Sequence, residues 1–431
     1  MAQTRVVMAW RDVPAIRSFD GFRKQGGYEA FLKAARLTPD ELIELVKASG
    51  LRGRGGAGFP TGLKWSFVPR NSGKPKYLCV NADESEPGTC KDREIIENLP
   101  HQLIEGILIC CHAVGIEKAF IYIRGEMLEG YQVLKKAVDE AYQQGFLGQN
   151  IQNTGINIDV VVHRGAGAYI CGEESALLTS IEGGRGFPRL RPPFPAVEGL
   201  YACPTVINNV ETIATLPAIL RHGAAWYAAM GTEKSKGTRL ISLSGHVKRP
   251  GNYEIELGKV TFRDLIYSPD LGGGMLDDLE PKAIIPGGAS APFLIPAEHL
   301  DVPLDFEAIA AAGSMAGSGA VVIISEKTCI VSAVLNLVEF FHEESCGKCT
   351  PCREGTGWLV QLLKRVKHGE ATEHDLEVLF DVCDNILGKA FCPLGDSATA
   401  PVTSGLHYFR EEFRAFLKGE KEKLKEKAPT P

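Results

Sequence analysis

Three cysteines stand close together near the end of the chain, and a fourth follows further on. Cys346, Cys349 and Cys352 have the spacing C-x2-C-x2-C, and Cys392 lies downstream, directly before a proline. A cubane iron–sulfur cluster is held by four thiolates, and a run this short can supply three of them. Structural zinc more often uses two separated C-x2-C pairs. The spacing therefore favours [4Fe–4S], with a zinc knuckle or free thiols as the alternatives.

A glycine-rich segment, residues 53–65, is the second place where chemistry is expected. Its glycines would let the backbone approach a flat or anionic ligand and present N–H groups to it. The segment contains G-x-G-x-x-G, but a predicted helix precedes it and Pro60 interrupts the residues after it, unlike a dinucleotide-binding turn. A flexible surface loop is the alternative. The glycines and the charged and aromatic side chains concerned are Gly53, Gly55, Gly56, Gly58, Arg54, Lys64, Phe59 and Phe67.

Polar residues follow a predicted buried strand, residues 77–82. Ligands of α/β proteins bind at the carboxyl ends of the strands. Asn81 and the carboxylates of residues 83–86 could therefore form the polar rim of a cofactor site, the alternative being a solvated turn. The carboxylates are Asp83, Glu84 and Glu86.

A second glycine-rich stretch, residues 165–172, follows another predicted strand and precedes a helix. Such a helix N-terminus favours anions, yet Glu173 and Glu174 stand at the same place and would oppose a phosphate. The two glutamates fit better as acceptors for ribityl or ribose hydroxyls, or as charges that tune a ring. Stabilisation of the helix N-terminus is the alternative.

The elements that would position these residues alternate along the first half of the chain. Strands at 77–82, 119–123 and 157–162 alternate with helices at 99–114 and 127–144, which predicts an α/β fold with a Rossmann-like, doubly wound parallel sheet. A capping box at residues 38–41 predicts a further helix start.

The later part of the chain has a different pattern. Short strands at 239–244, 251–256, 283–285 and 320–324 with a helix at 262–267 predict a small α+β unit, and helices are expected at 331–343, 354–367, 375–386 and 411–427. We expect four parts: an N-terminal extension at 1–37, a ligand-binding α/β domain at 38–235, the small domain at 239–325, and a helical domain carrying the cysteines at 330–431.

The composition excludes some classes of function. The net charge of −6 argues against nucleic acid as the main partner. No run of about 18 apolar residues is present, so we expect no membrane-spanning segment. Twelve cysteines, most of them scattered outside the motif, fit a reducing compartment, and the first residues lack the apolar core of a secretory signal. We therefore expect a cytoplasmic protein without direct membrane insertion.

Six segments together resemble the flavin- and NADH-binding subunit of respiratory complex I, the NADH–quinone oxidoreductase. The resemblance covers nearly the whole chain. The segments are GRGGAGFPTGLKW at 53–65, VNADESEPGT at 80–89, GAYICGEES at 167–175, PPFPA at 192–196, NNVET at 208–212 and SCGKCTPCREG at 345–355. One departure is Arg191, where the family pattern leads us to expect lysine.

The resemblance implies FMN as the flavin, a [4Fe–4S] cluster and NADH as the substrate. It implies that hydride passes from NADH to FMN and that electrons then pass through the cluster to neighbouring subunits, toward quinone. The residues implied at the FMN site are Gly53, Arg54, Gly55, Lys64, Asn81, Asp83, Glu84, Tyr169, Gly172, Glu173, Glu174, Asn208, Asn209 and Thr212, on a loop that includes Gly56 and Gly58.

Further roles are implied by the same resemblance. Phe59, Phe67 and Phe194 would stack around the NADH adenine, and Glu86 would approach the nicotinamide end. Glu84 and Glu86 would tune the flavin without acid–base catalysis. Cys392 becomes the fourth cluster ligand. The small domain resembles a ubiquitin-like β-grasp module, and the last domain a helical bundle.

The implied partners are a thioredoxin-like [2Fe–2S] subunit and the large iron–sulfur subunit of complex I. The chain would sit in a peripheral arm attached to the inner face of the membrane through other subunits. Two other interpretations remain. The first is the diaphorase subunit of an NAD-linked hydrogenase or formate dehydrogenase, whose chains often carry extra iron–sulfur domains. The second is a non-catalytic zinc-binding scaffold, which gives no reason for the acidic and glycine-rich strand ends.

Overall fold

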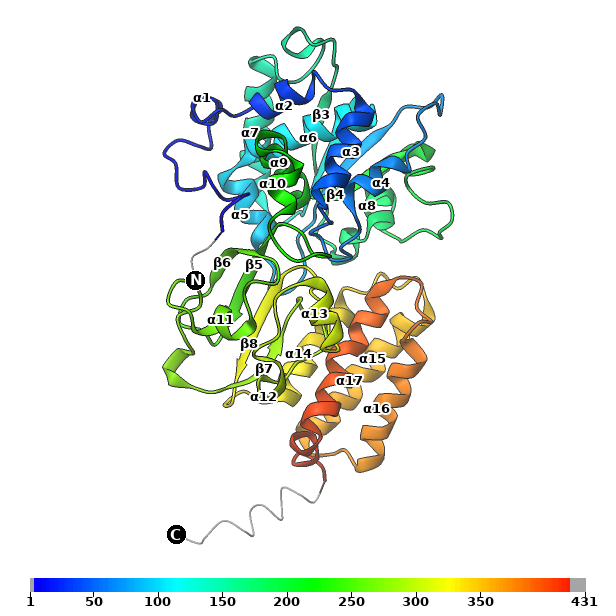
Figure 1. The fold of residues 1–431 in the computed structure, drawn as a ribbon. Helices are drawn as coiled ribbons and strands as arrows, with labels where there is room; N and C mark the ends of the chain where they lie inside the picture. Colours follow the sequence, from blue (N-terminus) through cyan, green and yellow to red (C-terminus); the bar gives the residue numbers. More distant parts are fainter. Residues whose placement is uncertain (1–3, 419–431) are drawn as a thin grey trace.

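The computed structural model describes residues 4–418 of the 431-residue chain. In this part of the chain, two four-stranded sheets and a bundle of long helices occupy three regions (Figure 1). The first sheet and its covering helices form the upper region of the view. The second sheet packs directly against the bundle beside it, because Ala283, Ile285 and Ile324 of that sheet share one apolar core with the bundle helices.

The first sheet is parallel and has the order β3-β2-β1-β4. The predicted doubly wound α/β fold is confirmed, although the third strand begins two residues later than expected. The strand order reverses between β1 and β4, and ligands of such sheets bind outside the carboxyl ends at the reversal. The strands are β1 (Tyr77–Ala82), β2 (Lys118–Ile123), β3 (Asp159–Arg164) and β4 (Thr205–Asn209).

Helices cover this sheet and build its core. The predicted capping box is present, since the Glu41 N–H donates to Thr38 Oγ1 and the Thr38 N–H donates to Glu41. The helices are α1 (Phe19–Lys24), α2 (Glu29–Ala34), α3 (Pro39–Ser49), α4 (Thr61–Ser66), α5 (Lys91–Asn98), α6 (Pro100–Val114), α7 (Leu128–Gln143), α8 (Glu174–Ile181), α9 (Val210–His222) and α10 (Ala224–Ala228), with 3-10 turns η1 (Ile151–Asn153), η2 (Tyr169–Gly172) and η3 (Leu200–Ala202).

The N-terminal segment packs into the first region and also bonds to the second. Phe22, Tyr28 and Phe31 are fully buried in the same core as the sheet helices. The backbone N–H groups of residues 6–8 each donate to the buried Glu254 carboxylate at 2.9 Å. Glu254 thereby joins the start of the chain to the second sheet.

The second sheet is mixed, with the order β6-β5-β8-β7 and only the central β5–β8 pair parallel. The helix at 262–267 is observed as predicted. This topology supports the β-grasp assignment, which together with the domain boundaries stays a prediction. The elements are β5 (Thr238–Gly245), β6 (Gly251–Glu256), α11 (Phe262–Tyr267), η4 (Leu276–Asp278), β7 (Pro281–Ile285), α12 (Pro296–His299), α13 (Phe306–Ala311) and β8 (Ala320–Ser325).

The bundle differs from the prediction at two places. The helix expected from residue 354 begins at Thr350, and the long helix α17 begins directly after Cys392. A helix was expected at 411–427. Of its described residues, 411–418, the first four are helical, as the end of α17; residues 419–427 lie outside the described residues. The sequence did not predict most of α17, because Pro401 and the glycines inside this helix have low helix propensity. The helices are α14 (Ile330–Glu343), α15 (Thr350–His368), α16 (Glu373–Ile386) and α17 (Pro393–Arg414).

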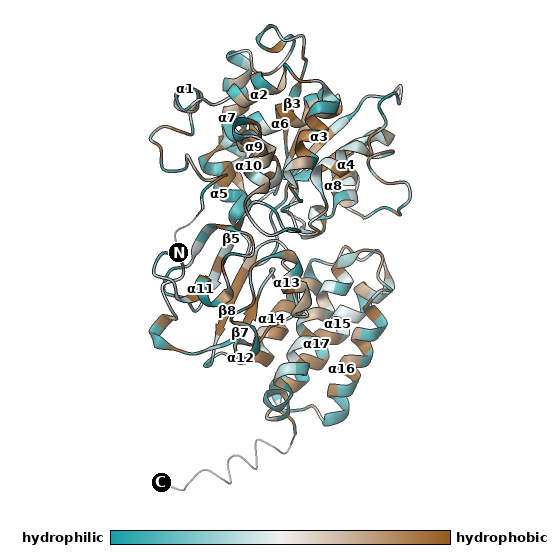
Figure 2. Cartoon of the chain, in the orientation of Figure 1, coloured by the Kyte–Doolittle hydropathy of each residue, from teal (hydrophilic) through white to brown (hydrophobic). Residues whose placement is uncertain are grey.

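Apolar burial holds the bundle together. Figure 2 shows hydrophobic (brown) and hydrophilic (teal) stretches alternating along α15, α16 and α17, and one face of each helix is buried in a common core. Between residues 4 and 418, no helix is long and apolar enough to cross a membrane.

The Glu254→Gln variant tests the joint at the N-terminal segment. We expect it to lower the free energy of unfolding by about 1–3 kcal/mol, because an amide NH2 would face buried N–H donors that now meet a carboxylate. Chemical denaturation measures this value. Glu298→Gln, at an exposed position, is the matched control, and equal stability of the two variants would contradict the role given to Glu254.

Candidate functional site

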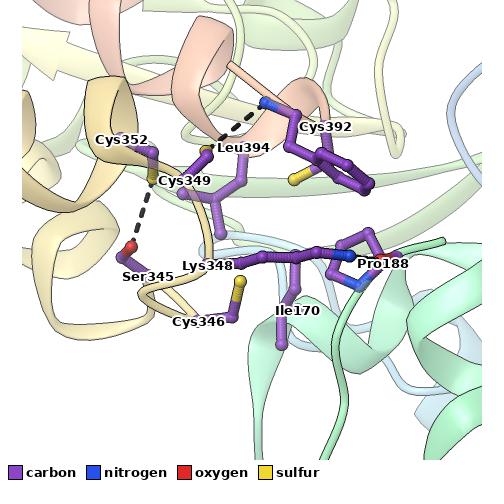
Figure 3. Close-up of a pocket in the computed structure, with 10 residues that line it drawn as sticks. Ile170, Pro188, Ser345, Cys346, Lys348, Cys349, Cys352, Cys392 and Leu394 are labelled. Carbon is purple, nitrogen blue, oxygen red and sulfur yellow. Dashed lines mark hydrogen bonds between the residues drawn. The ribbon is translucent and has the colours of Figure 1, made fainter. Parts of the chain in front are cut away.

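The four motif cysteines line one pocket (Figure 3). Cys346, Cys349 and Cys352 come from the turn before α15 and its first turn, and Cys392 comes from the residue before α17. Cys352 is therefore on a helix, not in the loop that the spacing predicted. Other walls of the pocket are Ile170, Pro188, Ser345, Lys348, Phe391 and Leu394.

Two helices begin at this pocket. Cys349 occupies the N-cap position of α15 and Cys392 that of α17. Helix N-termini carry partial positive charge and stabilise negative charge nearby. The pocket therefore suits a group that gains negative charge, as a thiolate-bound cluster does on reduction.

Hydrogen bonds reach two of the sulfur atoms. The Phe391 N–H donates to Cys349 Sγ at 3.4 Å, and Ser345 Oγ lies 3.2 Å from Cys352 Sγ. Burial raises the pKa of the Cys352 thiol and raises that of Cys392 to about 12. Since metal binding requires thiolates, loading this pocket would release protons.

The donor set fits an iron–sulfur cluster. Within residues 4–418, no group of three or more His, Cys, Asp or Glu side chains is placed to hold a single metal ion. The four cysteines surround a shared space, with the thiolate donors that an iron–sulfur cluster takes.

The second site lies at the carboxyl edge of the parallel sheet. Asn81 of β1 is the direct neighbour of Asn209 of β4 in the strand register. The glycine loop reaches this edge, because a Cβ on Gly55 would lie 3.0 Å from Asn209 Cβ. Two bonds join this loop and the following α4 to the β4–α9 connection: the Arg54 N–H donates to Thr212 Oγ1, and Trp65 donates to Asn208.

The Arg54 side chain is held by protein groups. Its guanidinium is fully buried and donates to Tyr227 Oη at 3.0 Å and to the Lys236 carbonyl at 2.9 Å. Among the described residues, its Nε and Nη1 atoms have no hydrogen-bond partner. Contact of Arg54 with FMN stays a prediction.

The carboxylates after β1 have different surroundings. Glu84 accepts the N–H groups of Asp92 and Arg93 at the start of α5, and burial raises its pKa well above the usual range. Burial also raises the pKa of Asp83 to about 7. Asp83 Oδ2 and Ser85 Oγ are buried with no partner among the described residues. Such orphaned atoms fit hydroxyl groups of a bound ligand, as FMN carries on its ribityl chain.

Gly172 and Asn81 connect η2 to the strand end. Asn81 Nδ2 donates to the Gly172 carbonyl at 2.8 Å. A Cβ on Gly172 would lie 3.4 Å from the Asp83 carbonyl oxygen, so the two backbones approach closely here. The predicted site residues between 81 and 84 therefore lie beside Gly172.

Charged side chains gather at the start of α8. Glu173 accepts the N–H groups of Ser175 and Ala176, both at 2.9 Å, which is the helix stabilisation expected as its alternative role. Glu174 pairs with Lys64 at 3.1 Å and with Arg191 at 2.7 Å. Arg191 also pairs with Glu173 at 3.0 Å. The arginine that departs from the family pattern therefore contacts both glutamates.

The three predicted stacking rings are exposed. Phe59, Phe67 and Phe194 are 45%, 53% and 58% exposed, and the first two rings lie 6.1 Å apart. Their faces are available to a ligand.

Glu86 connects the first region of the molecule to a loop of the second region. It accepts the Tyr169 hydroxyl at 2.6 Å, and the N–H and hydroxyl of Ser290 at 2.8 and 2.7 Å. Sequence reasoning missed Ser290, because it lies in a loop of the second region and only the fold brings it here.

Comparison with known proteins identifies the family. Residues 46–218 match the model described as Nuo51 FMN-binding domain, and residues 332–416 match the NADH-ubiquinone oxidoreductase-F iron-sulfur binding region. The F subunit of the NADH-quinone oxidoreductase of Streptomyces coelicolor is 56% identical over 414 residues, covering 96% of this chain and 91% of that one. The chain belongs to the family of NADH-quinone oxidoreductase F subunits.

Two further F subunits and one solved structure are also similar to this chain. The proteins of Mycobacterium tuberculosis and Rhizobium meliloti are 55% and 53% identical, covering 91% and 94% of this chain and 88% and 96% of their own lengths. A crystal structure of an NAD+-reducing [NiFe]-hydrogenase has a TM-score of 0.84 at 34% identity, over 97% of this chain and 67% of that one. FMN and a [4Fe–4S] cluster are the cofactors of the two matched regions.

The Asp83→Asn variant tests the buried carboxyl at the strand end. The raised pKa means that folding favours protonated Asp83, so its contribution to stability is lost as pH rises from about 4 to about 7. Asparagine does not titrate. The melting temperature of the flavin-free variant, relative to that of the flavin-free unmodified chain, should therefore be higher at pH 8 than at pH 5.

Asp139→Asn, at an exposed position of α7, is the control and should show no such gain. An Asp83→Asn difference that is equal at both pH values would mean that the carboxyl is solvated.

Proposed function

We propose that this chain oxidises NADH within an NADH–quinone oxidoreductase and delivers the electrons to an iron–sulfur cluster in its own bundle. One observation carries the proposal: a single four-residue turn, η2, contributes to both sites. Ile170 lines the cysteine pocket, Tyr169 donates to Glu86, and the Gly172 carbonyl accepts from Asn81. A carrier at the strand ends and one in the pocket would therefore be neighbours.

When bound, FMN and a [4Fe–4S] cluster would supply the redox chemistry, namely acceptance of hydride from NADH and passage of single electrons. The residues of the chain bind and orient. We propose that the strand ends, the glycine loop and η2 hold FMN, and that Phe59, Phe67 and Phe194 hold the adenine of NADH. We propose Cys346, Cys349, Cys352 and Cys392 as the cluster ligands.

No side chain needs to act as a general acid or base in the hydride step. The Glu84 carboxylate accepts two helix N–H groups, and Glu86 is held by Tyr169 and Ser290. Both carboxyl groups are held in place by these donors rather than left free to move as proton carriers. We propose that their part is to tune the flavin.

The relatives are named as subunits of a larger enzyme. We propose that the neighbours of this chain are a thioredoxin-like [2Fe–2S] subunit and a large iron–sulfur subunit. These would carry the electrons toward quinone and attach the chain to the inner face of the membrane.

A second function is favoured by the similarity to the hydrogenase structure. In this alternative, the chain is the diaphorase subunit of an NAD-linked hydrogenase or formate dehydrogenase. The relatives named as parts of an NADH-quinone oxidoreductase are more similar, at 53–56% identity over nearly the whole chain against 34%. Purification of the native complex decides between the two functions, because hydrogen or formate would reduce NAD+ only in the second case.

Anaerobic absorbance spectra test the main proposal. After reconstitution with FMN, iron and sulfide, the chain should show a flavin band that NADH bleaches, above broad iron–sulfur absorbance. The Cys349→Ala variant should lose the cluster absorbance and keep FMN and most of its NADH–ferricyanide activity, because Cys349 belongs to the pocket and not to the strand ends. A colourless reconstituted protein that binds zinc would refute the proposal.

The Glu86→Gln variant tests the tuning role. We expect the midpoint potential of the flavin to rise, since removing a nearby negative charge makes the electron-rich reduced state less costly. Spectroelectrochemical titration at several pH values gives the potential. Glu117→Gln, at the exposed position directly before β2, is the control. An unchanged potential in Glu86→Gln would argue that the charge is too far from the flavin or screened.

A further inference from the structure

A buried ionic network lies next to the carboxyl edge of the parallel sheet, where FMN is proposed to bind. We call this edge the flavin edge. Lys91, the first residue of α5, is fully buried and forms ion pairs with Asp92 and Glu211, both at 2.8 Å. Asp92 and Glu211 are also almost completely buried. Such a cluster is costly to desolvate and strongly destabilising to break on one side only.

The network holds the side chain of Asn209 in one orientation. Asn209 Nδ2 donates to Asp92 Oδ2 at 2.6 Å, while Asn209 Oδ1 accepts the Glu211 N–H at 3.0 Å and lies 3.4 Å from Lys91 Nζ. Reversing the amide would place its NH2 against two donors and its oxygen against a carboxylate. Asp92 and Lys91 therefore recognise the two ends of the amide separately.

The orientation of Asn209 matters for the glycine loop. Gly55 approaches Asn209 so closely that a Cβ on the glycine would lie 3.0 Å from Asn209 Cβ. Asn209 also faces Asn81 across the β1–β4 pair. A displaced Asn209 would move the surface on which the loop rests and widen the edge where FMN is proposed to lie.

The same network reaches the second sheet. Glu211 Oε1 accepts the Leu240 N–H of β5 at 2.8 Å, and α5 and β5 are adjacent in Figure 1. Through Glu211, the position of β5 is coupled to that of Lys91 and hence of Asn209. The second sheet therefore helps to position the residues at the flavin edge.

We infer that Lys91, Asp92 and Glu211 are positioning residues for FMN, which act by fixing the amide of Asn209 rather than by touching the cofactor. This inference rests on the proposed function. If the network serves stability alone, its disruption will loosen the fold without a selective effect on the flavin.

Titration of FMN into the flavin-free full-length chain, followed by quenching of FMN fluorescence, tests the inference. The main variant is Asp92→Asn, because its amide cannot accept from both Lys91 and Asn209. Loss of one hydrogen bond to a charged group predicts FMN affinity about tenfold lower than in the unmodified chain. The flavin midpoint potential of the reconstituted variant should also shift.

Asp375→Asn is the matched control. Asp375 is a buried carboxylate of α16 that accepts from Thr372 and pairs with Arg365, far along the chain from the flavin edge. It should lower the melting temperature and leave FMN affinity and potential unchanged. Should Asp92→Asn fail to fold, Glu211→Gln takes its place, with a smaller loss of FMN affinity expected from the weakened hold on Lys91.

The outcomes separate the two hypotheses. Reduced FMN affinity in the network variants, with normal affinity in Asp375→Asn, supports the positioning role. Equal FMN affinity in the network variants and the unmodified chain overturns it, even where their melting temperatures fall. An unmodified chain that binds no FMN would overturn the proposed function and, with it, this inference.

Discussion

Buried backbone N–H groups require acceptors, and in this chain buried carboxylates supply many of them. Glu254 accepts from residues 6–8, Glu105 from residues 30 and 31, and Glu84 from the first turn of α5. Each of these carboxylates accepts hydrogen bonds from backbone N–H groups that are not bonded within a helix or a strand. The placement of the N-terminal segment, the parallel sheet and the second sheet therefore depends on a few side chains, each of which would leave several donors unpaired if lost.

This constraint also explains why acidic residues near a ligand site are hard to interpret from sequence. Glu84 and Glu173 stand where ligand contacts were predicted, and both are acceptors for helix N-termini. A carboxylate has about four lone-pair sites, so one group can hold a helix and still face a ligand. Their contacts with FMN stay predictions, whereas their structural contacts are observed.

Local patterns made much of the fold predictable. The alternation of strands and helices indicated the parallel sheet, and the cysteine spacing indicated the pocket, because both depend on residues close in sequence or on a strong chemical preference. The features that the sequence did not predict depend on distant contacts. Packing made a helix of α17 despite Pro401, the Arg54 guanidinium bonds to Tyr227, and Ser290 reaches Glu86 from a loop of the second region. No window of sequence contains these partners.

The pocket draws three cysteines from one short run and the fourth, Cys392, from beyond α16. Before the chain has passed through α15 and α16 and turned back, the four thiols cannot meet. With these four cysteines as the proposed ligands, we expect cofactor insertion to follow or accompany the pairing of these helices, and a bound cluster would in turn favour the folded bundle by mass action. Maturation of the electron carrier and folding of the last domain are, on this view, a single coupled event.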